Sequence, residues 1–112
     1  MRRNSLYFGP AVTLVLFASL AIPSALLAQS DAEKTFKANC VLCHAADGSG
    51  SSPTGKALKA KDLRSDEVQK TSDADLITVI TNGKGKMPAF GKKLKPEDIQ
   101  ALVVYVRGLA KK

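Results

Sequence analysis

The chain has 112 residues, of which 45% are hydrophobic, 5% are aromatic and 24% are charged, and its formal net charge is +7. A chain of this length forms one small domain at most, which excludes a multidomain protein. Its two cysteines and single histidine are also too few for a structural zinc site, which takes four ligands of these types.

Residues 1–28 look like an export signal. Two arginines at the start precede an apolar run over residues 11–20, and no further charged side chain occurs before Asp31. We therefore expect a signal peptide that is cleaved after Ala28 or up to three residues earlier, and an exported, periplasmic protein. The alternative is an uncleaved membrane anchor, because residues 6–28 are long enough to span a bilayer.

The expected mature domain, residues 29–112, is small and basic. Residues 1–28 contain two of the 17 basic side chains and none of the 10 acidic ones. The mature domain therefore has 15 basic and 10 acidic side chains, a net charge of about +5. A domain this short buries little apolar surface and usually needs a disulfide, a metal or another internal cross-link for stability. Its only aromatic residues are Phe36, Phe90 and Tyr105. We therefore expect that a bound group, and not side chains alone, fills the centre of the fold.

A helix is expected at the start of this domain. Ser30 followed by Glu33 has the pattern of a capping box, which opens a helix. Apolar residues at helical spacing extend this helix through Asn39. The helix leads directly to the two cysteines of the chain.

The next residues, Cys40–His44, form the motif Cys-x-x-Cys-His, in which c-type haem is attached. Two thiolates one helical turn apart can add to the two vinyl groups of one porphyrin. The imidazole of the following residue then lies under the iron. We therefore predict one covalently attached haem c, with Cys40 and Cys43 as its attachment sites and His44 as the proximal axial ligand.

Three other interpretations explain this motif less well. A disulfide between Cys40 and Cys43 would close so small a loop that it would stabilise little, and it would leave His44 unexplained. A thioredoxin-type redox pair would need a βαβ context, and the sequence has no strand pattern. A zinc site would need a fourth ligand.

A second helix and a loop follow. Ser72 with Asp75 opens a helix over residues 73–81, and Gly83 ends it. The loop beyond contains Met87 between glycines and lysines. A thioether opposite a histidine favours ferrous iron and raises the reduction potential, so we expect Met87 to be the distal axial ligand. The alternative is that Met87 only packs.

The last predicted helix begins at Pro96. Proline is favoured at the first helical position, and Glu97 and Asp98 are favoured in the first turn. Lys95 is a poor N-cap. The helix has an apolar face that packs on the first helix. Short helical pieces within residues 55–61 or around 65–70 are also compatible with the sequence.

The motif Cys40–His44, the preceding residues 36–39, the pair Asn82-Gly83 and the run Met87–Gly91 together resemble the class I c-type cytochromes. The resemblance is to the small monohaem bacterial and photosynthetic-type members and covers residues 29–112. It implies an all-α fold of three main helices wrapped around one covalently bound haem. It also implies that Phe36 and Tyr105 lie where the first and last helices cross.

The same resemblance implies roles for single residues. Cys40 and Cys43 would form the thioethers, and His44 and Met87 would be the axial ligands. Pro53 stands where such proteins place a proline whose carbonyl accepts the hydrogen bond from the other nitrogen of the ligating histidine. The alternative for Pro53 is a plain turn.

A haem with two protein ligands leaves no open position for a substrate, so we expect an electron carrier and no enzyme. Two alternatives stay open. The domain could be a haem subunit of a larger membrane or enzyme complex, or a haem sensor in which Met87 leaves the iron. Five leucines are candidate walls of the haem pocket: Leu58, Leu63, Leu76, Leu94 and Leu102.

Five lysines lie between Thr81 and Pro96 with no acidic residue among them, and we call them the basic rim: Lys84, Lys86, Lys92, Lys93 and Lys95. Such a surface would steer an acidic redox partner by transient docking. The alternative is a merely solvated face. No nucleic-acid motif accompanies the lysines. We expect a monomer that does not associate with a membrane unless the N-terminal segment is retained.

Overall fold

The computed structural model describes residues 9–10 and 13–110, and in this part of the chain it contains six helices and no strand. The expected all-α fold is confirmed. The nearest feature to a strand is an isolated bridge between Lys84 and Met87. The helices are α1 Ser24–Asn39, α2 Val41–His44, α3 Pro53–Leu58, α4 Asp66–Gln69, α5 Asp73–Asn82 and α6 Pro96–Gly108.

Helix α1 begins six residues earlier than the sequence predicts. It starts at Ser24, directly after Pro23, and its N-terminus has no side-chain cap. The predicted start at Ser30 is wrong because alanine, leucine and glutamine before it are good helix formers and no breaker separates them from the domain. These first turns pack on little, since Leu26 is 57% exposed.

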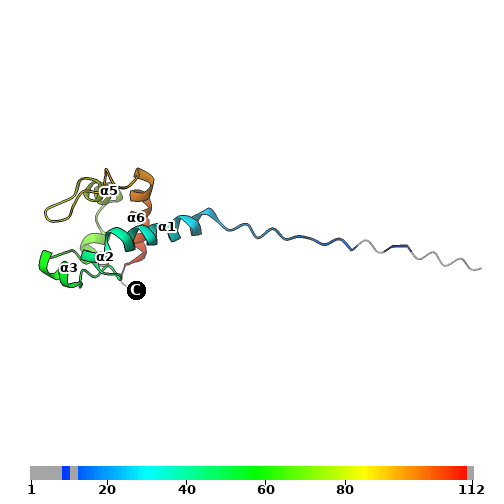
Figure 1. Cartoon of the computed structure of the whole chain (residues 1–112), viewed down its shortest axis with the longest axis horizontal. Coiled ribbons are helices and arrows are strands. Elements are labelled where there is room, and N and C mark those ends of the chain that lie inside the picture. Colours follow the sequence, from blue (N-terminus) through cyan, green and yellow to red (C-terminus); the bar gives the residue numbers. More distant parts are fainter. Residues whose placement is uncertain (1–8, 11–12, 111–112) are drawn as a thin grey trace, which may run out of the picture.

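The segment before α1 is extended and exposed. Figure 1 shows it running away from the helices, and Phe17 and Leu20 in it are almost fully exposed. Within the described residues no helix combines the length and the apolar composition needed to cross a membrane. Residues 1–8 and 11–12 of the expected signal peptide or anchor lie outside the described residues.

The core forms where α1 crosses α6 (Figure 1). Phe36 of α1 is 1% exposed, and its ring centroid lies 5.0 Å from that of Tyr105 in α6, with the two rings tilted by 44°. This confirms the predicted crossing of the first and last helices. The other buried apolar side chains are Ala32, Val68, Ile99, Leu102, Val103 and Val106.

The predicted caps of the two later helices are confirmed. The Ser72 hydroxyl accepts a hydrogen bond from the Asp75 amide at 3.1 Å, and α5 ends at Asn82, one residue beyond the predicted end. Helix α6 begins at Pro96, and Lys95 makes no side-chain capping bond. The short helices α3 and α4 lie close to the two predicted short pieces.

Helix α6 is also tied to the connection between α4 and α5. The Arg107 guanidinium donates hydrogen bonds to the carbonyl oxygens of Gln69 and Thr71 and forms an ion pair of 2.7 Å with Asp73. The Gln69 amide group donates to the Val106 carbonyl at 3.0 Å. These polar contacts hold α6 against residues 69–73, and they do so outside the apolar core.

Val103 and Val104 offer a matched test of this core. Val103 is 2% exposed and Val104 is 67% exposed, although both lie on α6. Val103→Ala should lower the free energy of unfolding by about 2 kcal/mol, because it removes buried methyl groups and leaves a cavity. Val104→Ala should change it by less than about 0.5 kcal/mol. Denaturant unfolding of both variants measures the difference, and equal losses would contradict the packing described.

Candidate functional site

A cavity of about 490 Å³ lies among the helices, and every helix contributes to its lining. This volume is typical of small-molecule and cofactor sites. All five leucines predicted to form walls line it, which confirms that prediction: Leu58, Leu63, Leu76, Leu94 and Leu102. Three buried side chains of α6, those of Leu102, Val103 and Val106, also form part of this wall.

Cys40 and Cys43 lie half-buried at this cavity, and no disulfide joins them. Cys40 ends α1 and precedes α2, and the His44 amide donates to the Cys40 carbonyl at 2.9 Å, which closes one helical turn. Burial, with a smaller contribution from Cys43, raises the pKa of the Cys40 thiol to about 11. A redox-active Cys-x-x-Cys pair has instead a lowered thiol pKa, so this environment does not favour thioredoxin-type chemistry.

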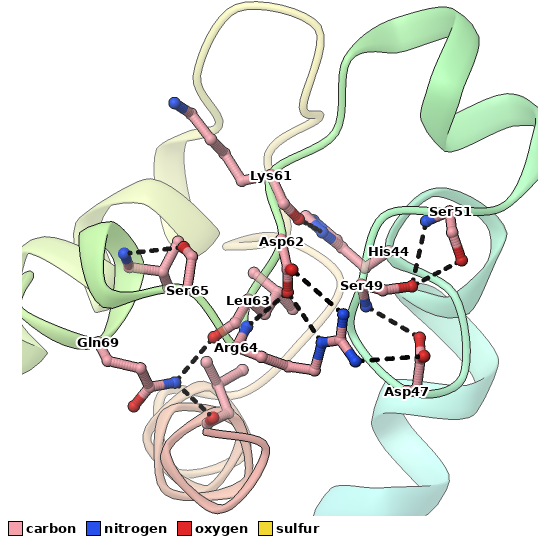
Figure 2. A network of polar contacts seen from close by, with 12 residues as sticks. His44, Asp47, Ser49, Ser51, Lys61, Asp62, Leu63, Arg64, Ser65 and Gln69 are labelled. Atoms are coloured by element: carbon pink, nitrogen blue, oxygen red, sulfur yellow. Dashed lines mark hydrogen bonds and ion pairs between the residues drawn. The ribbon is translucent and has the colours of Figure 1, made fainter. Parts of the chain in front are cut away.

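His44 is the third residue of the motif at the cavity. Its Nδ1 atom lies 3.0 Å from the carbonyl oxygen of Lys61 (Figure 2). A carbonyl only accepts, so Nδ1 carries the proton, and in the neutral imidazole Nε2 then keeps its lone pair. The imidazole is thereby held in the tautomer that can bind a metal through Nε2.

The expectation that the Pro53 carbonyl accepts this hydrogen bond is wrong, because Lys61 supplies the acceptor. Pro53 is the first residue of α3, where its fixed φ suits a helix start. The Leu63 amide donates to the Gly48 carbonyl at 2.7 Å, and this contact brings residues 60–63 beside the imidazole. Any residue can offer a carbonyl, so nothing in the sequence marks Lys61 for this role.

Ser52 and Gly55 brace the helix that carries Cys43, and sequence reasoning missed both. The Ser52 hydroxyl donates to the Leu42 carbonyl at 2.7 Å and accepts from the Gly55 amide at 2.9 Å. A side chain at position 55 would collide with the Cys43 carbonyl and would lie 2.6 Å from the Gly50 carbonyl. The signal in the sequence is the Ser-Pro-x-Gly pattern, in which an N-cap serine precedes a helix-starting proline.

Met87 lies on the loop after α5 and lines the same cavity as His44. The loop is closed by two backbone hydrogen bonds between Lys84 and Met87, of 2.9 and 3.1 Å. Two further bonds attach it to the end of α5, from Phe90 to Ile80 and from Gly91 to Thr81. The position of Met87 is therefore set by backbone contacts on both sides of it.

The lysines of the basic rim are all exposed, and Lys84 and Lys86 lie at the cavity. Glu67 of α4 also reaches this part of the cavity lining and forms an ion pair of 2.7 Å with Lys61. The hydrogen bond from Lys61, aided by its charge, lowers the pKa of Glu67, and Lys84 contributes least. This surface is therefore positive with one paired carboxylate beside it.

Comparisons with known proteins agree with this geometry. Residues 28–106 match the family model described as "Cytochrome C oxidase, cbb3-type, subunit III". The chain is 40% identical over 98 residues to cytochrome c6 of Nostoc sp., which covers 87% of this chain and 86% of that protein. It is 37% identical over 107 residues to cytochrome c6 of Gloeothece citriformis, which covers 90% of each chain.

A solved structure gives the same result. The KustC0563 c-type cytochrome superposes with a TM-score of 0.67 at 38% identity, over 72% of this chain and 99% of that one. The chain belongs to the class I c-type cytochromes. This cytochrome therefore carries covalently attached haem c with its iron and transfers electrons. The donor set at the cavity fits that group, since it offers two free thiols, an imidazole Nε2 with a lone pair and a thioether.

Gly55 provides a test of the brace on α2. Gly55→Ala should lower the fraction of this cytochrome that acquires covalent haem and should reduce stability, because the added Cβ collides with the Cys43 carbonyl. Gly108→Ala is the matched control, since a Cβ there meets nothing within 4 Å, and it should stabilise helix α6 by about 0.5–1 kcal/mol. Haem staining and thermal unfolding of both variants measure the outcome. A Gly55→Ala protein with normal haem content and stability would contradict the brace.

Proposed function

We propose that this cytochrome is an exported, periplasmic monohaem electron shuttle whose haem is held by Cys40, Cys43, His44 and Met87. One observation carries the proposal: these four side chains, from two distant parts of the chain, line a single cavity. Two sulfurs one helical turn apart suit thioether attachment. The lone pair on Nε2 of His44 and the thioether of Met87 suit the two axial positions of an iron.

Each residue of the site has a separate task in this proposal. The bound haem would supply the one-electron change at iron. The thioether of Met87 favours the reduced state, and the Lys61 carbonyl fixes the tautomer of His44. The leucines of the cavity lining exclude water. With His44 and Met87 as its ligands, the iron would have no open position for a substrate, so the protein is proposed to have no enzymatic activity.

The basic rim is proposed to be the docking surface for an acidic redox partner. Its five lysines are exposed, and two of them lie at the cavity. Positive charge beside the site of electron exchange raises the rate of encounter with an acidic protein and still allows rapid release. The protein is proposed to act as a monomer, because transient docking needs this surface free.

A second candidate is a haem subunit of a larger membrane or enzyme complex, tethered by an uncleaved N-terminus. Two observations favour it. The segment before α1 is apolar and exposed, and the matching family model is described as an oxidase subunit. Mass spectrometry of the native N-terminus separates the two candidates. A chain that begins near Gln29 supports the shuttle, whereas one that retains residues 1–28 and sediments with a complex supports the subunit.

Met87→Ala tests the distal ligand. The variant should keep covalent haem, because the attachment residues are untouched, but its reduction potential should fall and its iron should bind carbon monoxide readily. Leu94→Ala is the control, since Leu94 also lines the cavity but has no ligand atom. Potentiometry and visible spectra of the reduced protein measure both effects. An unchanged potential in Met87→Ala, or ready carbon monoxide binding by the native protein, would contradict Met87 ligation.

The basic rim predicts a dependence on salt. The double variant Lys92→Gln with Lys93→Gln should lower the association rate with an acidic redox protein by about threefold or more at low ionic strength, and added salt should remove the difference. Lys34→Gln with Lys70→Gln makes the same charge change outside the rim and should have a smaller effect. Stopped-flow electron transfer measures the rates, and equal losses in the two double variants would show that only net charge matters.

A further inference from the structure

Two loops meet beside His44. The loop over residues 45–52 follows the haem motif, and the segment over residues 60–65 supplies the Lys61 carbonyl (Figure 2). The contact between them is close, because Gly50 has a φ of +73° and a Cβ there would lie 2.6 Å from the Ala60 carbonyl and 3.2 Å from that of Lys61. The position of the acceptor for His44 therefore depends on how these two segments are held together.

Arg64 connects the two segments through side chains (Figure 2). Its Nε and Nη2 atoms donate to the two carboxylate oxygens of Asp62 at 3.0 and 3.2 Å, in a bidentate fork. Its Nη1 atom lies 3.6 Å from Oδ2 of Asp47, on the other loop. The Arg64 and Asp62 side chains are only 31% and 29% exposed. Arg64 thus bridges a carboxylate of each segment.

Each carboxylate also accepts a hydrogen bond from a backbone amide of its own segment. The Asp62 carboxylate accepts the Arg64 backbone amide at 2.9 Å, which fixes the turn that follows Lys61. The Asp47 carboxylate accepts the Ser49 amide at 2.9 Å. The hydrogen bonds from Ser49, with a smaller contribution from the Arg64 charge, lower the pKa of Asp47. The Asp47 end of the bridge is therefore charged at neutral pH.

We propose that Arg64 is a positioning residue for His44: by joining Asp47 to Asp62 it holds the Lys61 carbonyl against Nδ1 and so helps to set the reduction potential. This inference rests on the proposed role of His44 as the axial ligand. It assigns to the bridge a task beyond stability. The fold itself has other ties between the two segments, including the bond from the Leu63 amide to the Gly48 carbonyl at 2.7 Å.

The sign of the effect separates this role from simple electrostatics. A hydrogen bond from Nδ1 to a carbonyl raises the basicity of the imidazole and so favours the oxidised iron. Weakening that bond should raise the reduction potential. Removing a nearby positive charge should lower it, because a positive charge favours the state with the extra electron. A substitution that keeps the charge but loses the fork therefore isolates the hydrogen bond.

Arg64→Lys is that substitution, because lysine keeps the charge but cannot hold two carboxylates in a planar fork. The variant should have a higher reduction potential than the native protein. Solvent exchange of the His44 Nδ1 proton, followed by NMR in the reduced state, should be about fivefold faster. Arg107→Lys is the matched control: it loses the contacts to Gln69 and Thr71 on another part of the fold, and it should lower thermal stability without changing either measurement.

Three outcomes are distinguishable. A raised potential with faster exchange in Arg64→Lys alone supports the proposal. An Arg64→Lys protein that carries haem and matches the native protein in both measurements overturns it, as does an equal effect of Arg107→Lys. A native protein whose spectra show that His44 does not bind the iron would instead remove the proposed role on which the inference rests.

Discussion

The packing of Phe36 against α6 is the contact on which the haem site depends. The Cys40 amide donates to the Phe36 carbonyl at 2.8 Å, so Cys40 follows the anchored aromatic residue by one helical turn. The side chains of Leu102, Val103 and Val106 are buried in this core and also line the cavity. Stability and cofactor binding therefore use the same atoms in this cytochrome, and a change in the α1–α6 core changes a wall of the site.

Beyond that core, the site is held mainly by backbone carbonyls and short caps. The Ser52 hydroxyl satisfies a carbonyl at the end of α2, and the Lys61 carbonyl orients His44. Paired backbone bonds close the loop that carries Met87. A domain with few aromatic residues cannot position every ligand by packing alone, so local hydrogen bonds supply the rigidity that a fixed coordination geometry requires.

The parts of this arrangement that the sequence predicts are those with side-chain signatures. The spacing of Cys40–His44, the cap at Ser72 and the proline at position 96 each require particular residue types, and the structure has them where they were expected. The acceptor for His44 has no such signature, because every residue has a carbonyl and only the path of the loop decides which one is near. The pattern at Ser30 misplaces the start of α1 for a related reason: it has the form of a cap, but strong helix formers precede it and the helix starts at Ser24.

Charge is distributed differently around His44 and Met87, and this difference bears on how an electron carrier can dock without a change in its reduction potential. The loop of Met87 exposes lysines with no acid between them. The loops around His44 instead pair Arg64 with two carboxylates, which more than offset its positive charge and leave it less able to attract an acidic partner. An acidic protein drawn to the lysines would therefore meet the Met87 side first. The hydrogen bond of His44 would lie outside the contact with the partner. Separate residues would then set the rate of encounter and the reduction potential.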